Sequence, residues 1–93
     1  MRFEWDSEKA RRNLSAHGVD FEDAKRAVLD PFRLEVVDDR FAYGEERIQI
    51  IGACFGDVLF VVTVFISEDH CRIISARPAT RPESQRYFTH DQA

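Results

Sequence analysis

Between Glu46 and Arg77 the chain is patterned almost continuously for β-structure, and this stretch limits the possible folds more than any other. It is rich in β-branched and aromatic residues, which favours strands. The pair Gly56-Asp57 is typical of a two-residue hairpin turn, and residues 67–70 supply the next reversal. We therefore predict an antiparallel meander with strands at Glu46–Phe55, Val58–Ser67 and Cys71–Arg77.

Two helices are predicted ahead of these strands. Asp6 can cap a helix over Ser7–Ala16, and Gly18 can end it in the left-handed conformation. Asp20 can cap a second helix, which Pro31 ends. The apolar face of this second helix has helical spacing and consists of Phe21, Ala24, Ala27 and Val28.

The remaining segments complete an α+β fold. Short strands are predicted at Arg2–Trp5 and Leu34–Asp38, and an acidic loop follows at Asp39–Glu45. A last helix is predicted at Arg81–His90, with Pro82 in its first turn. The predicted class is thus a small twisted antiparallel sheet with two N-terminal helices and one C-terminal helix.

The hairpin turns also predict which side chains share a face of the sheet. Pairing Phe55 with Val58, and Ile66 with Cys71, places Phe60 opposite Arg77. One face then carries polar groups, and Arg47 lies about 20 Å from Arg77 along the strands. The other face is the better candidate for burial under the helices and carries Ile48, Ile50, Val61, Phe65 and Ile74.

Length and composition indicate one domain over residues 1–93 that needs no metal or disulfide to build a core. No apolar run is long enough to span a bilayer, and the charged start does not resemble a signal peptide. We therefore expect a cytoplasmic protein. Cys54 and Cys71 fall in predicted strands and are expected to be free thiols, since neither they nor the histidines have the spacing of zinc ligands.

The formal net charge of −4 argues against a general nucleic-acid binder, which usually presents a basic surface. The charge is uneven, however. Residues 34–71 contain two basic and eight acidic side chains, whereas residues 72–93 contain four basic and two acidic ones, not counting His90. A local basic patch can still bind phosphate, although long-range attraction of RNA would be weak.

Arg77 is the leading candidate for a functional cation. It lies where the last predicted strand ends, and Pro78 stiffens the following segment. A guanidinium held in this way can bind two phosphate oxygens at once. The alternative is an ion pair with a carboxylate such as Glu83, which would fix the C-terminal helix instead.

Other candidates have structural alternatives of the same kind. Arg47 and Arg72 could contact phosphate or form surface ion pairs. His17 is the histidine best placed for a general base, at a helix C-terminus whose dipole favours the protonated ring. It could instead cap the helix by bonding the last carbonyls.

Aromatic residues near these cations could contact a base. Tyr87 lies one turn after Glu83 and could bond a phosphate or stack on a base, or simply pack its helix onto the sheet. Trp5 could stack on a base or belong to the core. Lys9 could contact a phosphate or lie on the solvated surface.

The candidate residues above, together with further blocks along the chain, resemble the BrnT family of toxins over most of the sequence. The glutamate-arginine pair Glu46-Arg47 also fits, as does Gly52 in the strand that follows. The other matching residues are Phe3-Glu4-Trp5-Asp6, Lys9, Asn13, His17-Gly18-Val19, Phe21, Ala24, Arg72-Ile73-Ile74-Ser75-Ala76-Arg77-Pro78-Ala79, Glu83 and Tyr87.

The resemblance implies a RelE-like bacterial ribonuclease toxin that cleaves RNA without a metal or other cofactor and so inhibits translation and growth. It also implies a BrnA-like ribbon-helix-helix antitoxin as partner, through which alone the toxin would reach operator DNA. Carried to this sequence, it implies catalytic roles for His17, Arg47, Arg77 and Tyr87, and substrate contacts for Lys9, Trp5, Arg72 and Glu83.

One position departs from the family pattern. Ser84 follows Glu83 where relatives usually have arginine, which removes a cationic contact that Arg81 or Arg86 could replace. Together with the negative net charge, this leaves a second hypothesis open. The chain could be a catalytically weak or inactive interaction module that acts with its antitoxin as a transcriptional co-repressor.

Overall fold

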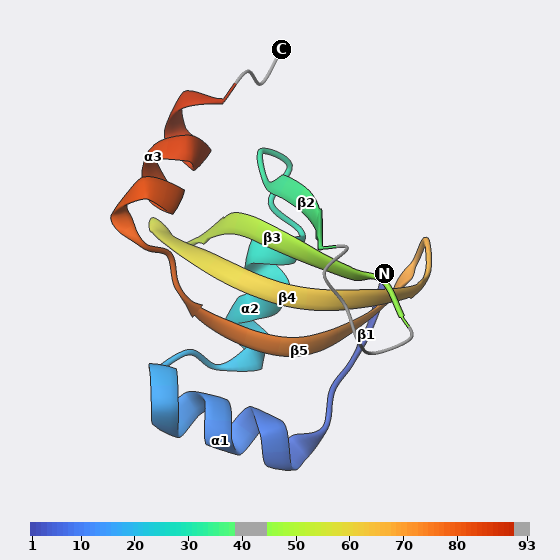
Figure 1. Cartoon of the computed structure of the whole chain (residues 1–93). Helices are drawn as coiled ribbons and strands as arrows, with labels where there is room; N and C mark the ends of the chain where they lie inside the picture. The colour runs from blue at the N-terminus through green and yellow to red at the C-terminus, as the bar shows by residue number, and fades with distance from the viewer. Residues whose placement is uncertain (39–44, 91–93) are drawn as a thin grey trace.

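The computed structural model describes residues 1–38 and 45–90, so most of the predicted acidic loop lies outside the described residues. Within these ranges three helices and five strands follow one another (Figure 1). Their order is β1 (Arg2–Glu4), α1 (Ser7–His17), α2 (Phe21–Val28), β2 (Leu34–Asp38), β3 (Arg47–Cys54), β4 (Asp57–Ser67), β5 (His70–Pro78) and α3 (Arg81–Thr89).

The predicted α+β class is confirmed. The strands form one sheet in the order β1-β5-β4-β3-β2, in which the pairs β2–β3, β3–β4 and β4–β5 are antiparallel. The short β1 pairs with β5 in parallel, which the sequence analysis did not predict. In Figure 1, α2 crosses behind the sheet, α1 runs below β5, and α3 stands at the end of the sheet where β5 stops.

Both N-terminal helices begin where their caps predict, whereas α1 ends one residue later than predicted, at His17, and α2 already ends at Val28, three residues before Pro31. The Asp6 carboxylate accepts hydrogen bonds from the backbone N–H groups of Glu8 and Lys9, and Gly18 ends α1 with a φ of 71°. The Asp20 carboxylate accepts one from the N–H of Glu22 at the start of α2. Local sequence is thus sufficient to set these helix boundaries.

The core lies between α2 and the sheet. The four apolar residues predicted for α2 are all at most 1% exposed. At Gly52 in β3 the helix lies directly on the strand backbone, since a Cβ there would come within 2.2 Å of the Ala27 carbonyl oxygen. Cys54 and Cys71 are buried free thiols, and burial raises the pKa of Cys71 to about 11.

The first hairpin turn lies one residue earlier than predicted. Cys54 pairs with Asp57, so the turn residues are Phe55 and Gly56, not Gly56 and Asp57. Both have positive φ, 50° and 89°, as a type I′ turn requires. Phenylalanine is unusual in this conformation, which is why the sequence pattern favoured the other placement.

The last two strands pair as predicted near Arg77 but not throughout. Phe60 lies opposite Arg77 and Val62 opposite Ser75, whereas Cys71 lies opposite Phe65 instead of Ile66, because β5 contains a bulge. The bulge also changes which isoleucine of β5 is buried, so the prediction for Ile74 is wrong. Ile73, which is 1% exposed, takes the buried position expected for Ile74.

Asn13 joins α1 to the rest of the fold. Its side-chain nitrogen donates to the carbonyls of Val19 and Ala76 at 3.0 and 2.8 Å, and its oxygen accepts from the Ala76 N–H at 3.0 Å. The amide therefore pairs with both the N–H and the C=O of Ala76, along the part of the β5 edge that the short β1 does not cover. It also fixes the turn between α1 and α2.

Asp30 holds α3 against the sheet. Its carboxylate accepts hydrogen bonds from the Tyr87 hydroxyl in α3, the Ala53 N–H in β3 and the Phe32 N–H. Burial alone would raise the pKa of Asp30, but these three donors together lower it. Burial, and then the bond to Asp30, raises the pKa of Tyr87 to about 12.

None of the helices in the described ranges is long and apolar enough to cross a membrane.

Replacing Asn13 with alanine is predicted to lower the free energy of unfolding by about 2–4 kcal/mol, because three buried backbone groups lose their partner. The neighbouring Leu14 is 47% exposed, so Leu14→Ala serves as the control and should change stability by less than about 0.5 kcal/mol. Chemical denaturation of both variants measures the difference. Equal stabilities would contradict the role of the amide.

Replacing Tyr87 with phenylalanine is predicted to change how stability depends on pH at the alkaline end. The folded-state pKa of about 12 lies above the ordinary 10.0, so the tyrosine's contribution is complete below pH 10 and is lost as pH rises toward 12. The difference in unfolding free energy between the parent and Tyr87→Phe should therefore shrink over that interval. A constant difference across it would exclude a Tyr87 phenol held protonated by Asp30.

Candidate nucleic-acid interface

A shallow basic groove of about 340 Å³ runs between α1 and β5. Lys9, Arg12 and His17 supply its charged and ionisable side chains, and all three are exposed. No carboxylate is among the lining residues, which are completed by Asn13, Ala16 and Ile74. The groove is therefore locally basic, on a chain whose net charge is −4.

The helical repeat of α1 brings these side chains together. Positions three and four apart are neighbours on a helix, so Lys9 lies one turn before Arg12 and Asn13, and these lie one turn before Ala16 and His17. Within the described residues, the side chains of Lys9, Arg12 and His17 form no hydrogen bond or ion pair. Their donors are thus available to a ligand.

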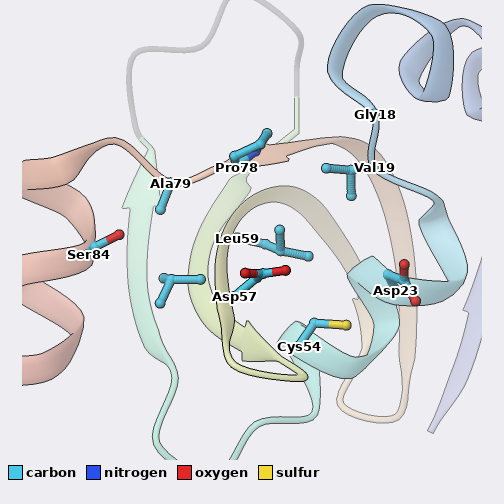
Figure 2. Close-up of a pocket in the computed structure, with 10 residues that line it drawn as sticks. Gly18, Val19, Asp23, Cys54, Asp57, Leu59, Pro78, Ala79 and Ser84 are labelled. Carbon is cyan, nitrogen blue, oxygen red and sulfur yellow. The ribbon is translucent and has the colours of Figure 1, made fainter.

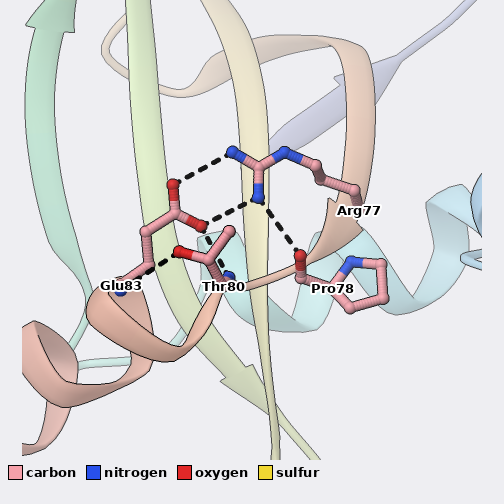
Figure 3. Close-up of polar contacts among 4 residues, drawn as sticks. All are labelled: Arg77, Pro78, Thr80 and Glu83. Carbon is pink, nitrogen blue, oxygen red and sulfur yellow. Dashed lines mark hydrogen bonds and ion pairs between the residues drawn. The ribbon is translucent and has the colours of Figure 1, made fainter.

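Arg77 is held by Glu83 at the start of α3 (Figure 3). Its two terminal nitrogens donate to the two oxygens of the carboxylate at 2.8 and 3.0 Å. The hydrogen bond from Arg77 is the main reason why the pKa of Glu83 is lowered. The guanidinium also lies 4.1 Å from the centre of the Phe60 ring.

The same glutamate caps α3. Glu83 accepts from the Thr80 N–H at 2.9 Å while its own N–H donates to the Thr80 hydroxyl at 3.3 Å, which completes a capping box. The Arg77 side chain is 35% exposed and that of Glu83 18%. The arrangement corresponds to the structural alternative for Arg77, in which the ion pair fixes the C-terminal helix.

The predicted cations do not converge. Arg77 does not line the groove. Since Arg77, Phe60 and Ile51 lie in one cross-strand row, Arg47 is four residues further along β3 and two strands away, about 16 Å. Arg47, at the start of β3, is opposite Asp38. The two arginines therefore lie well apart on the sheet, and neither lines the groove.

The other predicted contacts lie in separate places. Arg72 Nε donates to the Glu4 carboxylate at 2.8 Å across the paired strands β1 and β5. The other oxygen of this carboxylate lies 2.6 Å from His70 Nε2. Trp5 packs edge-on against Phe21, 5.9 Å between ring centres, and belongs to the core. Tyr87 is only 6% exposed and faces Asp30. Of the predicted site residues, only Lys9 and His17 share the groove.

A second cavity, of about 470 Å³, lies beside the turn between α1 and α2 (Figure 2). Gly18 and Val19 of that turn line it, together with Asp23, Cys54, Asp57, Val58, Leu59, Pro78, Ala79 and Ser84. Its ionised side chains are the carboxylates of Asp23 and Asp57, so this carboxylate cavity is unsuited to a phosphate.

Among the described residues, no three histidine, cysteine, aspartate or glutamate side chains gather as metal ligands.

Sequence analysis did not identify Arg12, Asp30 or the Thr80 cap. The Thr80–Glu83 spacing is the capping-box pattern and could have been found. Arg12 could have been found as the helical neighbour of Lys9. Asp30 carries no such signal, because its partner Tyr87 lies 57 residues away in the sequence.

Comparison with known proteins agrees with this fold. The model of the family described as "Ribonuclease toxin, BrnT, of type II toxin-antitoxin system" matches residues 5–83. The crystal structure of the Brucella abortus ribonuclease toxin BrnT is similar, with a TM-score of 0.63, 25% identity, and coverage of 87% of this chain and 99% of that one. No curated protein sequence matches significantly. Because the family match spans most of its length, the chain belongs to the BrnT family of ribonuclease toxins of type II toxin–antitoxin systems.

Proposed function

We propose that this chain is a metal-independent endoribonuclease that binds the RNA backbone in the groove of Lys9, Arg12 and His17. Family membership implies an RNA target and an antitoxin partner. The observation that supports the groove is its charge, since three cationic or ionisable side chains line it and no carboxylate does. RNA phosphates bind such sites mainly by electrostatic attraction.

The proposed reaction needs only groups of the RNA and of this chain. The 2′-hydroxyl oxygen forms a bond to the adjacent phosphorus while the bond from phosphorus to the 5′-oxygen breaks. His17 takes the proton from the 2′-hydroxyl, and a second proton, from solvent or a protonated side chain, goes to the departing 5′-oxygen. The products are a 2′,3′-cyclic phosphate and a 5′-hydroxyl. General-base catalysis of this kind contributes about 10²–10⁴-fold.

Lys9 and Arg12 would stabilise the negative charge that grows on the phosphate oxygens in the transition state. Arg77, Glu83 and Tyr87 are proposed to act as positioning residues, since their polar atoms already bond one another or Asp30. Any contact with RNA would lie outside the groove for the other predicted residues, Arg47, Arg72 and Trp5. The catalytic assignment thus moves from the end of β5 to α1.

We further propose that the toxin acts in the bacterial cytoplasm, where cleavage inhibits translation and growth. Its antitoxin would carry a ribbon-helix-helix domain, as the resemblance implies, and would supply the contacts of the complex to operator DNA. The toxin itself would then touch DNA only through its partner.

A second candidate function is a catalytically weak module that serves the antitoxin as co-repressor. The observation that favours it is the state of Arg77 and Tyr87, both of which already have carboxylate partners. Ser84, in place of the usual arginine, lines the carboxylate cavity and not the groove. Under this hypothesis the antitoxin complex would form normally and the free protein would not cleave RNA.

Alanine at Arg12 is predicted to reduce RNA cleavage by about 10–100-fold, because a cation beside the scissile phosphate is lost. Arg11→Ala is a matched control, since Arg11 precedes it on the same helix but pairs with Glu8 and does not line the groove. The control should stay within about twofold of the parent. Cleavage rates under single-turnover conditions, on proteins with equal melting temperatures, make the comparison. Equal losses in both variants would argue against a specific groove.

An RNA with a 2′-deoxy nucleotide at the cleavage position is predicted to resist cleavage there, because the attacking hydroxyl is missing. Cleavage of the unmodified RNA should continue in excess EDTA and leave a 2′,3′-cyclic phosphate, which mass spectrometry of the fragments detects. Cleavage of the deoxy substrate would reject the mechanism, and loss of activity in EDTA would reject metal independence. An unmodified RNA that stays intact under all conditions supports the co-repressor hypothesis.

A further inference from the structure

The most exposed aromatic side chain among the described residues is that of Phe55, at the tip of the β3–β4 hairpin. Phe55 is 81% exposed and has a φ of 50°, which an asparagine or glycine would adopt at lower cost. Core packing does not explain an aromatic residue there. Large exposed aromatic side chains are typical anchors of protein–protein interfaces.

The carboxylate cavity lies directly beside this tip. Cys54, Asp57 and Val58, which flank the turn in sequence, line it. Figure 2 shows Asp57 and the Cys54 sulfur directed into the cavity from the hairpin, with Asp23 of α2 opposite. An aromatic surface and a hollow of about 470 Å³ therefore adjoin each other.

The charge around this cavity selects its occupant. Asp23 and Asp57 are its ionised lining residues, and no lysine or arginine is among them. Arg26 lies at the rim, 3.9 Å from Asp23 and 4.6 Å from the centre of the Phe55 ring, so it offsets part of the charge of Asp23. Asp57 forms no ion pair with another described residue. The site attracts a cationic side chain and repels an RNA phosphate.

We propose that Phe55 and the adjoining cavity form the docking surface for the antitoxin, with an apolar side chain on the Phe55 ring and a lysine or arginine in the cavity. This rests on the antitoxin partner that the family implies and does not depend on RNA cleavage. The cavity and the basic groove share the turn after α1, where His17 faces the groove and Gly18 and Val19 line the cavity. A protein docked here stands beside His17 and blocks the approach of RNA to the groove.

The test measures the affinity of the antitoxin encoded in the same operon for purified toxin variants. Phe55→Asn removes the ring but suits a left-handed turn position, and Asp57→Lys replaces one of the two cavity carboxylates with a cation. Matched controls lie at the other end of β4: Ile66→Ala removes an apolar side chain that is 47% exposed, and Glu68→Lys reverses an exposed charge. Thermal melts establish that all four variants are folded.

Both test variants are expected to weaken antitoxin binding at least about tenfold, whereas both controls stay within about twofold. Higher salt should weaken the parent complex more than the Asp57→Lys complex. Affinities of Phe55→Asn and Asp57→Lys within twofold of the parent would overturn the proposal. So would normal antitoxin affinity combined with a loss of RNA binding, which would assign this surface to RNA.

Cleavage of RNA by the same free variants separates this inference from the proposed function. Activity equal to that of the parent is expected for Phe55→Asn and Asp57→Lys, since neither residue lines the groove. If the parent cleaves no RNA but the two variants still lose the antitoxin, the endoribonuclease proposal fails and the docking surface stands.

Discussion

The Asn13 amide is the interaction on which the arrangement of both candidate surfaces depends. It is 7% exposed and bonds the backbone of Val19 after α1 and of Ala76 in β5. Val19 lines the carboxylate cavity, while Asn13 itself lines the basic groove. Ala76 precedes Arg77, whose ion pair starts α3. A buried amide can satisfy several backbone groups at once only in one geometry, so its three bonds fix all these segments together.

Opposite charges on the two sides of one turn resolve the apparent conflict between an acidic protein and an RNA target. The net charge of −4 describes the whole chain, but binding depends on the field near the site. Lys9 and Arg12 lie on the groove side, and Asp23 and Asp57 on the cavity side. Because the ionised side chains that line each surface are of one sign, each surface favours a ligand of the opposite charge.

Local signals predicted the elements of this fold well, and long-range contacts account for what was missed. Asp6, Gly18 and Asp20 act within a few residues, so the helix boundaries could be read directly. The bulge that exchanges Ile73 for Ile74 depends on strand pairing, and the contact between Asp30 and Tyr87 on the complete fold. For the candidate groove, Lys9 and His17 were among the predicted site residues, whereas the choice between the two predicted roles of Arg77 depends on where the Glu83 carboxylate lies.

The partners of Arg77 decide between its two predicted roles. A phosphate that recruits this guanidinium must replace a bidentate carboxylate, which itself caps α3, and must draw the side chain from the Phe60 ring. Separating a fully buried pair costs about 3–5 kcal/mol, and partial exposure of Arg77 lowers that cost without removing it. No such cost applies to Arg12, whose side chain forms no ion pair with the described residues. These contacts are the reason why we propose phosphate binding on α1, and a positioning role for Arg77 at the end of β5.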